Sequence, residues 1–504
     1  MMKLATLLIL VLKVAASAAA PVKIVVFHTN DIHGWIMPRE EGEGAQKRSV
    51  GGAAALAAVI RKERGPKLVL DAGDWFQGTP EGTLSRGQAM VDVFNAVGYD
   101  AVTPGNHDYD LGEKNLQALV AGLKMPVLGA NVRKSFDGKR VGYLKPWIVK
   151  KVGGVKVGIF GLVTSRMRLW SFSENIAGLE FSREVDAAKE AVAALRALGA
   201  TVIIAVTHMG FERPDVPVFE GDQTLAAEVE GIDLIVGGHS HTVLKEPFRD
   251  PVHGTWIVQA GTTLAAVGRA TLEVDPATGK VLHASGRLIE LDVDKTGEAP
   301  LVKEAVRVHQ AAVSKIFDTV VATATVALSR NRDAESALGD WMMDCQRAFA
   351  KTDVALQNGG GIRADMAKGP VTLRTLFDIM PFDNRLVKVT MTGKDLRATL
   401  DHGVALAKIV QVSGLTVVYS RAAKPGQRLT AVRIGRMDML EPARLYSVAA
   451  NDFMVQGGDG YAGFEGAEKV EPTGTLVRDI LRGCAERAPE IALPEAGRLI
   501  PAGS

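Results

Sequence analysis

The sequence is short of cysteine, of unbalanced charge and of long apolar runs. Its 504 residues include only two cysteines, Cys345 and Cys484, which excludes a disulfide framework and a cysteine-based zinc site. The formal net charge is +2, and no stripe of Lys and Arg alternates with aromatic residues, so we expect no nucleic-acid polymer as a partner. An apolar fraction of 47% and a charged fraction of 23% are typical of a globular protein. Any anion must therefore be recognised by a local site.

The two cysteines leave two alternatives open. An exported protein could form one bridge between Cys345 and Cys484. Cys345 also lies in the apolar helical run 341–345, where a buried free thiol is equally compatible with the sequence.

The first twenty residues have the pattern of a secretory signal peptide. Lys3 precedes an apolar run from Leu4 to Leu12, and small residues offer cleavage after Ala18 or Ala20. The apolar run is too short to cross ~30 Å of hydrocarbon, and no later segment approaches the required length. We predict a signal peptide at residues 1–20, no transmembrane segment in the mature chain, and a secreted or periplasmic location.

Short runs of Val, Ile and Leu that end in polar residues organise the first part of the chain. They cover residues 23–28, 67–70, 155–160, 202–206 and 232–236, and helical stretches separate them. This alternation predicts an α/β domain whose buried strands end at one common edge. Catalytic and binding groups of α/β folds lie at such strand ends.

The pattern changes after residue 299. Residues 299–316 predict a single helix, and beyond it a strand, an amphipathic helix and glycine-rich turns follow. A chain of 504 residues is also too long for one ordinary core. We predict a first domain at 21–299, a linker helix at 300–318 and a second domain at 319–504. No Pro/Ser-rich linker separates them, so the domains should be closely joined.

Oxygen and imidazole side chains cluster at the predicted strand ends. The clusters hold five of the ten histidines, and they are Asp31-Ile32-His33, Gly73-Asp74, Gly105-Asn106-His107-Asp108, Thr207-His208 and Gly238-His239-Ser240-His241. Residues two apart in an extended chain point to the same side, so Asp-x-His and His-x-His pairs can reach one ion. Carboxylate, amide and imidazole ligands suit Zn²⁺, Mn²⁺ or Co²⁺. Because the ligands are too many for one tetrahedral ion, we predict two ions that share a carboxylate, an arrangement that hydrolyses phosphate esters.

In order and spacing these clusters resemble the motifs of the calcineurin-like metallophosphoesterases. The resemblance implies an α/β fold in which a four-layer β-sandwich is flanked by helices. It also implies one metal held by Asp31, His33, Asp74 and His241, and a second held by Asn106, His208 and His239 with Asp74 bridging. His107, held by Asp110, would face the phosphate and stabilise the transition state or assist the leaving oxygen. The family often has Glu where Asp108 stands.

The second domain resembles the carboxy-terminal domain of secreted 5′-nucleotidases and UDP-sugar hydrolases. The resemblance rests on residues 358–363, 381–384, 411–414, 451–453 and 457–461, and it implies a smaller α+β substrate-binding domain. The substrate-binding residues that it implies are Asn358, Gly360, Arg363, Arg397, Ile409, Gln411, Phe453 and Asp459. Arg363 offers a fork of donors to phosphate or ribose, and Phe453 can stack on a base. Ile409 stands where the family commonly has a second aromatic residue, and Arg397 is equally compatible with a solvated helix position.

The combined resemblance implies an exported enzyme that uses two divalent metal ions (Zn, Mn or Co) to hydrolyse nucleoside 5′-monophosphates to nucleoside and phosphate. The active site would lie between the domains, with a hinge near residues 300–318. The alternatives within hydrolases are a UDP-sugar hydrolase, a 2′,3′-cyclic-nucleotide phosphodiesterase and a thiosulfate-ester hydrolase. A remote alternative is an inactive extracellular nucleotide-binding protein. The sequence leaves open the metal, the preferred nucleotide or nucleotide sugar, and the oligomeric state.

Overall fold

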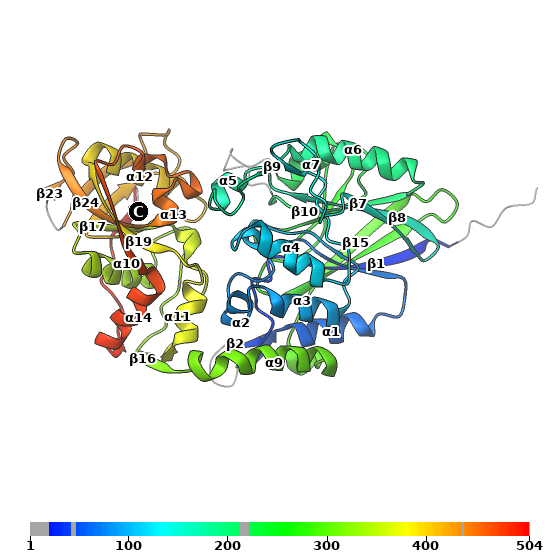
Figure 1. Ribbon diagram of the computed structural model, residues 1–504, viewed down its shortest axis with the longest axis horizontal. Helices are drawn as coiled ribbons and strands as arrows, with labels where there is room; N and C mark the ends of the chain where they lie inside the picture. Colours follow the sequence, from blue (N-terminus) through cyan, green and yellow to red (C-terminus); the bar gives the residue numbers. More distant parts are fainter. Residues whose placement is uncertain (1–19, 42–46, 212–220, 436–437, 503–504) are drawn as a thin grey trace, which may run out of the picture.

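The computed structural model describes residues 20–41, 47–211, 221–435 and 438–502. The predicted signal peptide lies outside these residues, apart from Ala20. Two domains lie side by side, and helix α9 (Pro300–Phe317) runs along one edge of the first domain toward the second (Figure 1). Within the described part of the chain, no helix combines the length and the apolar character needed to cross a membrane.

Two mixed sheets pack face to face at the centre of the first domain. In spatial order, one contains β15 (Val281–Glu290), β14 (Ala266–Val274), β1 (Val22–Thr29), β4 (Lys67–Asp71) and β5 (Ala101–Val102). The other contains β12 (Phe248–Arg249), β13 (Trp256–Val258), β11 (Leu234–Gly237), β10 (Val202–His208), β8 (Val155–Val163) and β7 (Trp147–Val152). Branched apolar side chains of both sheets, such as Val26 and Ile204, meet in one buried core.

Helices cover the outer face of each sheet. The first sheet is covered by α1 (Ala53–Lys62), α3 (Gln88–Val97) and α4 (Glu113–Gly122), and the second by α6 (Glu184–Ala197) and α7 (Asp222–Glu228) (Figure 1). The order helix, sheet, sheet, helix confirms the predicted four-layer α/β fold. Shorter elements of this domain are α2 (Pro80–Leu84), α5 (Met167–Trp170), α8 (Val293–Thr296), β2 (Pro38–Glu41), β3 (Arg48–Gly51), β6 (Val132–Lys134) and β9 (Leu179–Phe181).

The second domain is built around a five-stranded sheet. Its spatial order is β20 (Gln411–Ser413), β17 (Val354–Gln357), β24 (Leu445–Asn451), β19 (Arg385–Thr392) and β25 (Lys469–Leu476). Two smaller sheets contain β18 (Gly369–Thr372), β16 (Val320–Ala324) and β26 (Glu490–Ile491), and β23 (Asp438–Met439), β22 (Leu429–Ile434), β21 (Leu415–Tyr419) and β27 (Leu499–Pro501). The helices are α10 (Ala337–Ala350), α11 (Leu373–Ile379), α12 (Gly393–Ala405), α13 (Asp452–Val455) and α14 (Val477–Arg487), so the predicted α+β character is confirmed.

A disulfide joins two helices of the second domain. Cys345 of α10 and Cys484 of α14 are bonded, so the structure has the bridge rather than a buried free thiol. Both cysteines belong to the apolar cluster under α10 and α14, which places the bridge at the edge of a packed core.

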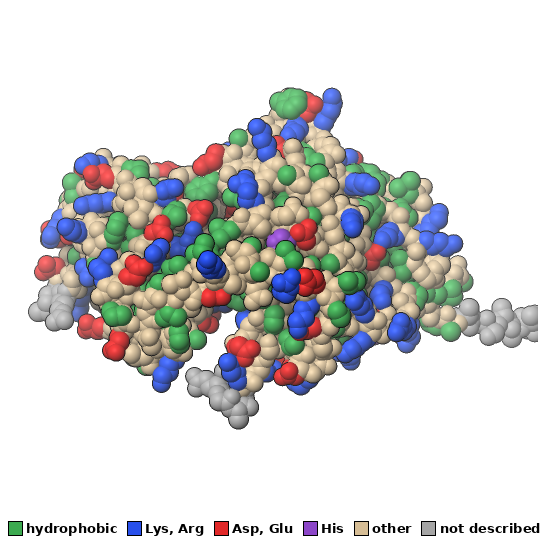
Figure 2. Space-filling model, turned by 60° about the horizontal axis from the view of Figure 1, so that its bottom comes forward, with side chains coloured by type: hydrophobic (Ala, Val, Ile, Leu, Met, Phe, Trp, Pro, Cys, Tyr) green, Lys and Arg blue, Asp and Glu red, His purple; other side chains and the backbone are tan. Residues whose placement is uncertain are grey.

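Polar contacts tie the two domains together beside α9. Arg374 of α11 donates to both carboxylate oxygens of Glu81 in α2, at 2.7 and 2.8 Å, and the Gln77 side chain donates to the carbonyl of Pro381 at 3.1 Å. On the face that Figure 2 shows, basic and acidic side chains are interspersed rather than gathered by sign. This mixed surface agrees with the small net charge of +2.

Candidate active site

Strand ends of both sheets of the first domain bring the predicted ligands to one edge. β1 runs parallel to β4, and β8, β10 and β11 run parallel to one another. Parallel strands present their carboxyl ends at the same edge, and the loops that follow β1, β4 and β11, with His208 at the end of β10, therefore meet there.

The side chains form two groups that could each hold a metal ion. One group is Asp31, His33 and His241, and the other is Asp74, His208 and His239. In the first group, His241 Nε2 lies 3.2 Å from His33 Nε2 and 3.3 Å from Asp31 Oδ1. Two ligands ~2.1 Å from one ion lie ~3.0–3.4 Å apart at angles near octahedral or tetrahedral values. The spacing of these atoms therefore fits a shared ion.

The second group has the same spacing and includes Asn106. The Oδ1 atom of Asn106 lies 2.8 Å from His239 Nδ1 and 3.2 Å from His208 Nε2. Asp74 Oδ2 lies 3.3 Å from His208 Nε2 and 3.8 Å from His33 Nε2. One oxygen of Asp74 thus faces both groups, which is the position that a bridging carboxylate requires.

Backbone carbonyls orient two of the imidazole rings. His33 Nδ1 lies 2.9 Å from the carbonyl of Gln77, and His208 Nδ1 lies 2.6 Å from the carbonyl of Ala72. A carbonyl can only accept, so each Nδ1 carries a proton and Nε2 is the nitrogen that faces the cluster. Nε2 is therefore the atom of each ring that a metal ion would take as its ligand.

Five of the seven predicted ligands have left-handed backbone conformations. Their φ angles are 52° at Asp31, 52° at His33, 59° at Asp74, 73° at His239 and 56° at His241. Such conformations cost on the order of 1–3 kcal/mol each for residues with a side chain and are concentrated at functional sites. The expectation that paired ligands reach one ion from an extended chain is therefore wrong, because tight turns aim them instead.

Glycine and aspartate backbone contacts make these turns possible. A Cβ on Gly105 would lie 2.2 Å from Asp74 Oδ1, so only glycine fits beside that carboxylate. The buried Asp108 carboxylate accepts hydrogen bonds from the backbone N–H groups of Gly105, Asp74 and Trp75 at 2.7, 3.0 and 2.9 Å. Asp108 thus supports the ligand loop from behind and does not point at the ligand groups.

Burial and charge set the protonation of the cluster. Burial, with a contribution from the Arg363 charge, holds the pKa values of His33 and His241 well below the usual value, so both rings are neutral. Burial raises the pKa of the Asp74 carboxyl, but the charges of His208 and His107 outweigh it and hold that pKa well below its usual range. Burial lowers the pKa of His208, but the Asp74 carboxylate outweighs it and raises that pKa to about 10, so this ring carries a second proton that a metal ion would displace. Neutral His33 and His241 and ionised Asp74 are already in the forms that bind metal.

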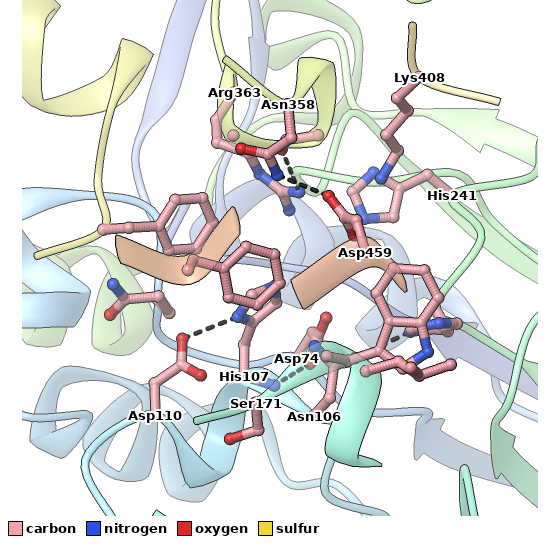
Figure 3. A pocket seen from close by; sticks show the side chains of 18 of the residues that line it. Asp74, Asn106, His107, Asp110, Ser171, His241, Asn358, Arg363, Lys408 and Asp459 are labelled. Carbon is pink, nitrogen blue, oxygen red and sulfur yellow. Dashed lines mark hydrogen bonds and ion pairs between the residues drawn. The ribbon is translucent and has the colours of Figure 1, made fainter. Parts of the chain in front are cut away.

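His107 and Asp110 form a separate pair on the cavity wall. His107 Nδ1 lies 2.7 Å from Asp110 Oδ2, and the His107 backbone N–H donates to Asp74 Oδ1 at 2.8 Å (Figure 3). Burial lowers the pKa of His107, but Asp110 and Asp74 outweigh it and raise that pKa above the usual value. The ring of Phe382 stacks on His107 with centroids 5.2 Å apart. His107 is therefore a partly buried, proton-bearing group beside the ligand cluster.

A cavity of about 420 Å³ lies between the domains, and four of the seven predicted ligands line it: Asp74, Asn106, His239 and His241. Of the predicted substrate-binding residues, five line it: Asn358, Gly360, Arg363, Phe453 and Asp459. Arg363 Nη2 lies 2.7 Å from His33 Nε2, so the second domain reaches the metal-ligand cluster of the first. Asn358 donates to Asp459 Oδ2 at 2.6 Å, and Figure 3 shows both beside Arg363 on one side of the cavity.

Three predicted substrate-binding residues do not line this cavity. The Arg397 guanidinium donates to the Leu429 carbonyl, and Ile409 is fully buried in the apolar core of the second domain. Gln411 is buried and accepts a hydrogen bond from the Ser336 backbone N–H at 2.9 Å. Packing around β20 buries the side chains of Ile409 and Gln411, and the half-buried Arg397 of α12 is directed toward β22 instead of the cavity.

Several lining residues were not predicted as site residues. The second domain adds Arg332, Phe382 and Lys408, and the first adds Trp170 and Phe172 from α5 and the turn after it. Phe172 meets Phe453 edge-on, with ring centroids 5.9 Å apart, so an aromatic contact joins the two domains at the cavity wall. Phe382 stands in the segment 381–384 that carries the resemblance of the second domain. For Trp170 and Phe172 the available signal is position, because the segment 164–172, rich in Arg and large apolar residues, follows the predicted strand at 155–160.

Comparisons with known proteins agree with this geometry. The family described as calcineurin-like phosphoesterase matches residues 24–243, and the 5′-nucleotidase C-terminal domain matches residues 319–466. A snake venom 5′-nucleotidase of Gloydius brevicauda is 29% identical over 96% of this chain and 89% of its own length. A 5′-nucleotidase of Bos taurus is 29% identical over 88% of this chain and 85% of its own length.

Solved structures extend the agreement to the whole fold. The 5′-nucleotidase precursor from Thermus thermophilus superposes with a TM-score of 0.87 at 30% identity, covering 96% of this chain and 100% of that one. A sulfate thiohydrolase from the same species, at 20% identity and a TM-score of 0.81 over 95% of this chain and 97% of its own, shares the fold. The chain therefore belongs to the 5′-nucleotidase family and is a metal-dependent phosphoester hydrolase that uses two divalent ions.

Proposed function

We propose that the protein hydrolyses nucleoside 5′-monophosphates to nucleoside and inorganic phosphate. The observation that carries the proposal is the cavity itself, because one wall holds members of both ligand groups and the other holds Asn358, Arg363, Phe453 and Asp459. A molecule with a phosphate at one end and a nucleoside at the other can contact both walls at once.

The proposed metal ligands are those of the two groups. Asp31, His33 and His241 would hold one ion, Asn106, His208 and His239 the other, and Asp74 would bridge them. When bound, the two ions supply the Lewis-acid chemistry of phosphoester hydrolysis. The chain contributes neutral imidazoles, buried carboxylates and turns that keep the ligand atoms in place before binding.

His107 would act directly on the reacting phosphate. Asp110 accepts from Nδ1 and leaves Nε2 free to face the cavity as a donor. A protonated imidazole there stabilises the charge that develops on the phosphoryl oxygens or protonates the departing 5′ oxygen. The Asp110 carboxylate holds the His107 ring in this orientation and stabilises the positive charge of the protonated ring.

The nucleoside would occupy the part of the cavity lined by the second domain. Phe453 offers a ring face for stacking on the base, and Phe382 provides a second aromatic surface nearby. Asp459 can accept a hydrogen bond from a ribose hydroxyl, while Asn358 holds its carboxylate at 2.6 Å. Arg363 lies between the ribose end and the phosphate end, where its planar fork can bind either.

The proposal includes export and a division of the chain into domains at 21–299 and 319–504, with residues 300–318 as the linker. The bonded pair Cys345–Cys484 supports an oxidising compartment, since structural disulfides are rare in reducing cytosol. The Arg374–Glu81 ion pair joins α11 to α2, and both helices pack against α9, so this contact between the domains lies beside the proposed hinge.

A substrate panel tests the proposal. The purified enzyme, stripped by a chelator and reloaded with Mn²⁺, Zn²⁺ or Co²⁺, is assayed for release of phosphate from AMP and for cleavage of UDP-glucose and 2′,3′-cyclic AMP. We expect metal-dependent release of phosphate from AMP with the highest kcat/KM of the three. A higher kcat/KM on UDP-glucose or on the cyclic nucleotide would replace the proposed substrate with that one, and binding of AMP without turnover would contradict the proposal.

A further inference from the structure

Lys408 is a cation in the cavity wall that the family motifs do not explain. It lies between α12 and β20, next to the buried Ile409, and its side chain faces the cavity. A Cβ placed on Gly360 would lie 3.4 Å from Lys408 Cδ, at ordinary van der Waals distance, so the lysine stem lies beside the glycine turn at 359–361. Figure 3 shows the Lys408 side chain on the side of the cavity where His241 and Asp459 lie.

The Lys408 ammonium has no counter-charge at contact distance within the described part of the chain. Burial and the positive charges of Arg332 and Arg363 lower the pKa of Lys408 to about 7, and Asp459 and Asp31 offset this only in part. Burial and the charges of Arg330 and Arg363 likewise lower the pKa of Arg332, to about 10. Cations that are desolvated close together repel one another, and an anion placed among them removes that cost.

The cations converge on the His33–His241 side of the metal-ligand cluster. Arg332 Nη2 lies 3.3 Å from His241 Nδ1, and Arg363 Nη2 lies 2.7 Å from His33 Nε2. All three basic side chains come from the second domain, while the ligand groups come from the first. An anion held by the three is therefore held against the ligand cluster, at the place where hydrolysis occurs.

We propose that Lys408 binds the phosphate of the substrate together with Arg363 and Arg332 and makes the enzyme selective for phosphate monoesters over diesters. This assignment rests on the proposed function, to which it adds the residue that selects monoesters. A phosphate monoester carries close to two negative charges near neutral pH, because its second pKa is about 6. A diester carries one, so an additional cation favours the monoester more strongly.

The test compares two substrates that share a leaving group. p-Nitrophenyl phosphate is a monoester and bis(p-nitrophenyl) phosphate is a diester, and neither contains a nucleoside. In Lys408→Met we expect kcat/KM on the monoester to fall by about 10–100-fold, as for loss of a charged hydrogen bond, and to fall on the diester by less than about 3-fold. Lys408→Arg should retain most of the selectivity, and the exposed control Lys424→Met should match the wild type.

Binding of inorganic phosphate to the metal-loaded protein, measured by calorimetry, gives a second readout. We expect its Kd to rise at least about tenfold in Lys408→Met and to stay unchanged in the control. Equal losses on both substrates with unchanged phosphate binding would overturn the proposal. A loss of bound metal in Lys408→Met would also overturn it, since Lys408 would then act on the ligand cluster and not on the substrate. Because the substrates lack a nucleoside, failure of the nucleotide assignment is distinguishable from failure of this one.

Discussion

Replacing Cys345 and Cys484 with alanine is expected to lower the free energy of unfolding of the second domain by about 2–5 kcal/mol. The bridge joins positions 139 residues apart. In the chain-entropy treatment, closing a loop of this length in the unfolded state removes about 5 kcal/mol of conformational entropy at 25 °C, which is an upper value because unfolded chains retain structure. Alanine avoids placing an unpaired hydroxyl at Cys345, which is buried in the apolar cluster.

Urea unfolding can isolate this effect because the second domain has one tryptophan. Trp341 lies in α10, one helical turn before Cys345, and the other five tryptophans precede residue 257. In a variant with those five changed to phenylalanine, Trp341 fluorescence reports the second domain alone, while circular dichroism follows the whole protein. Reduced wild type should unfold at the same urea concentration as the double-alanine variant. A stability change below about 1 kcal/mol would refute the reasoning that the bridge constrains the unfolded chain.

Three further predictions concern catalysis, base binding and pH. His107→Gln should lower kcat by about 10²–10⁴-fold while metal content by mass spectrometry stays at wild-type level, and loss of metal would show that His107 has another role. Phe453→Ala should raise KM for AMP by about 5–100-fold and leave kcat/KM on p-nitrophenyl phosphate unchanged, whereas equal effects on both substrates would contradict stacking. Burial raises the pKa of Asp233 to about 6, whereas the same carboxyl in the unfolded chain releases its proton near pH 4. Between these two pH values the folded protein holds a proton that the unfolded chain has lost, so the free energy of unfolding contributed by this group falls as pH rises from about 4 to about 6. Asp233→Asn should remove this fall in urea unfolding measured at pH 4.5, 5.5 and 7, and an unchanged pH dependence would contradict it.

The fold and the metal-ligand groups could be predicted because strong local signals coincide. Buried parallel strands are continuous runs of Val, Ile and Leu, and the polar residue after each run lies at the shared edge. The resemblance of the clusters then paired Asp31 with His241 and Asn106 with His208, which the structure brings together. The expectation that an extended chain aims paired ligands at one ion is wrong. The φ angle of 52° at Asp31 belongs to a tight turn, and the conformation of such a turn depends on neighbouring loops.

The substrate side could be predicted only in part. Glycine and arginine motifs led to Asn358 and Arg363, but whether a side chain faces the cavity or the core depends on packing that a motif does not encode. Ile409 and Lys408 are neighbours, yet Ile409 is fully buried in the core and Lys408 lines the cavity. Contacts between domains, such as Phe172 with Phe453, depend on the relative placement of two separately folded units, which residue patterns do not specify.

The central claim is that seven side chains from separate strand ends hold two divalent ions around Asp74. Anomalous X-ray diffraction from crystals of the Mn²⁺-loaded enzyme tests it directly. The account predicts two anomalous peaks ~3.5–4 Å apart, one beside His33 and His241 and one beside Asn106 and His208, with Asp74 in contact with both. A single peak, or peaks away from these side chains in an enzyme that is active with Mn²⁺, would contradict it.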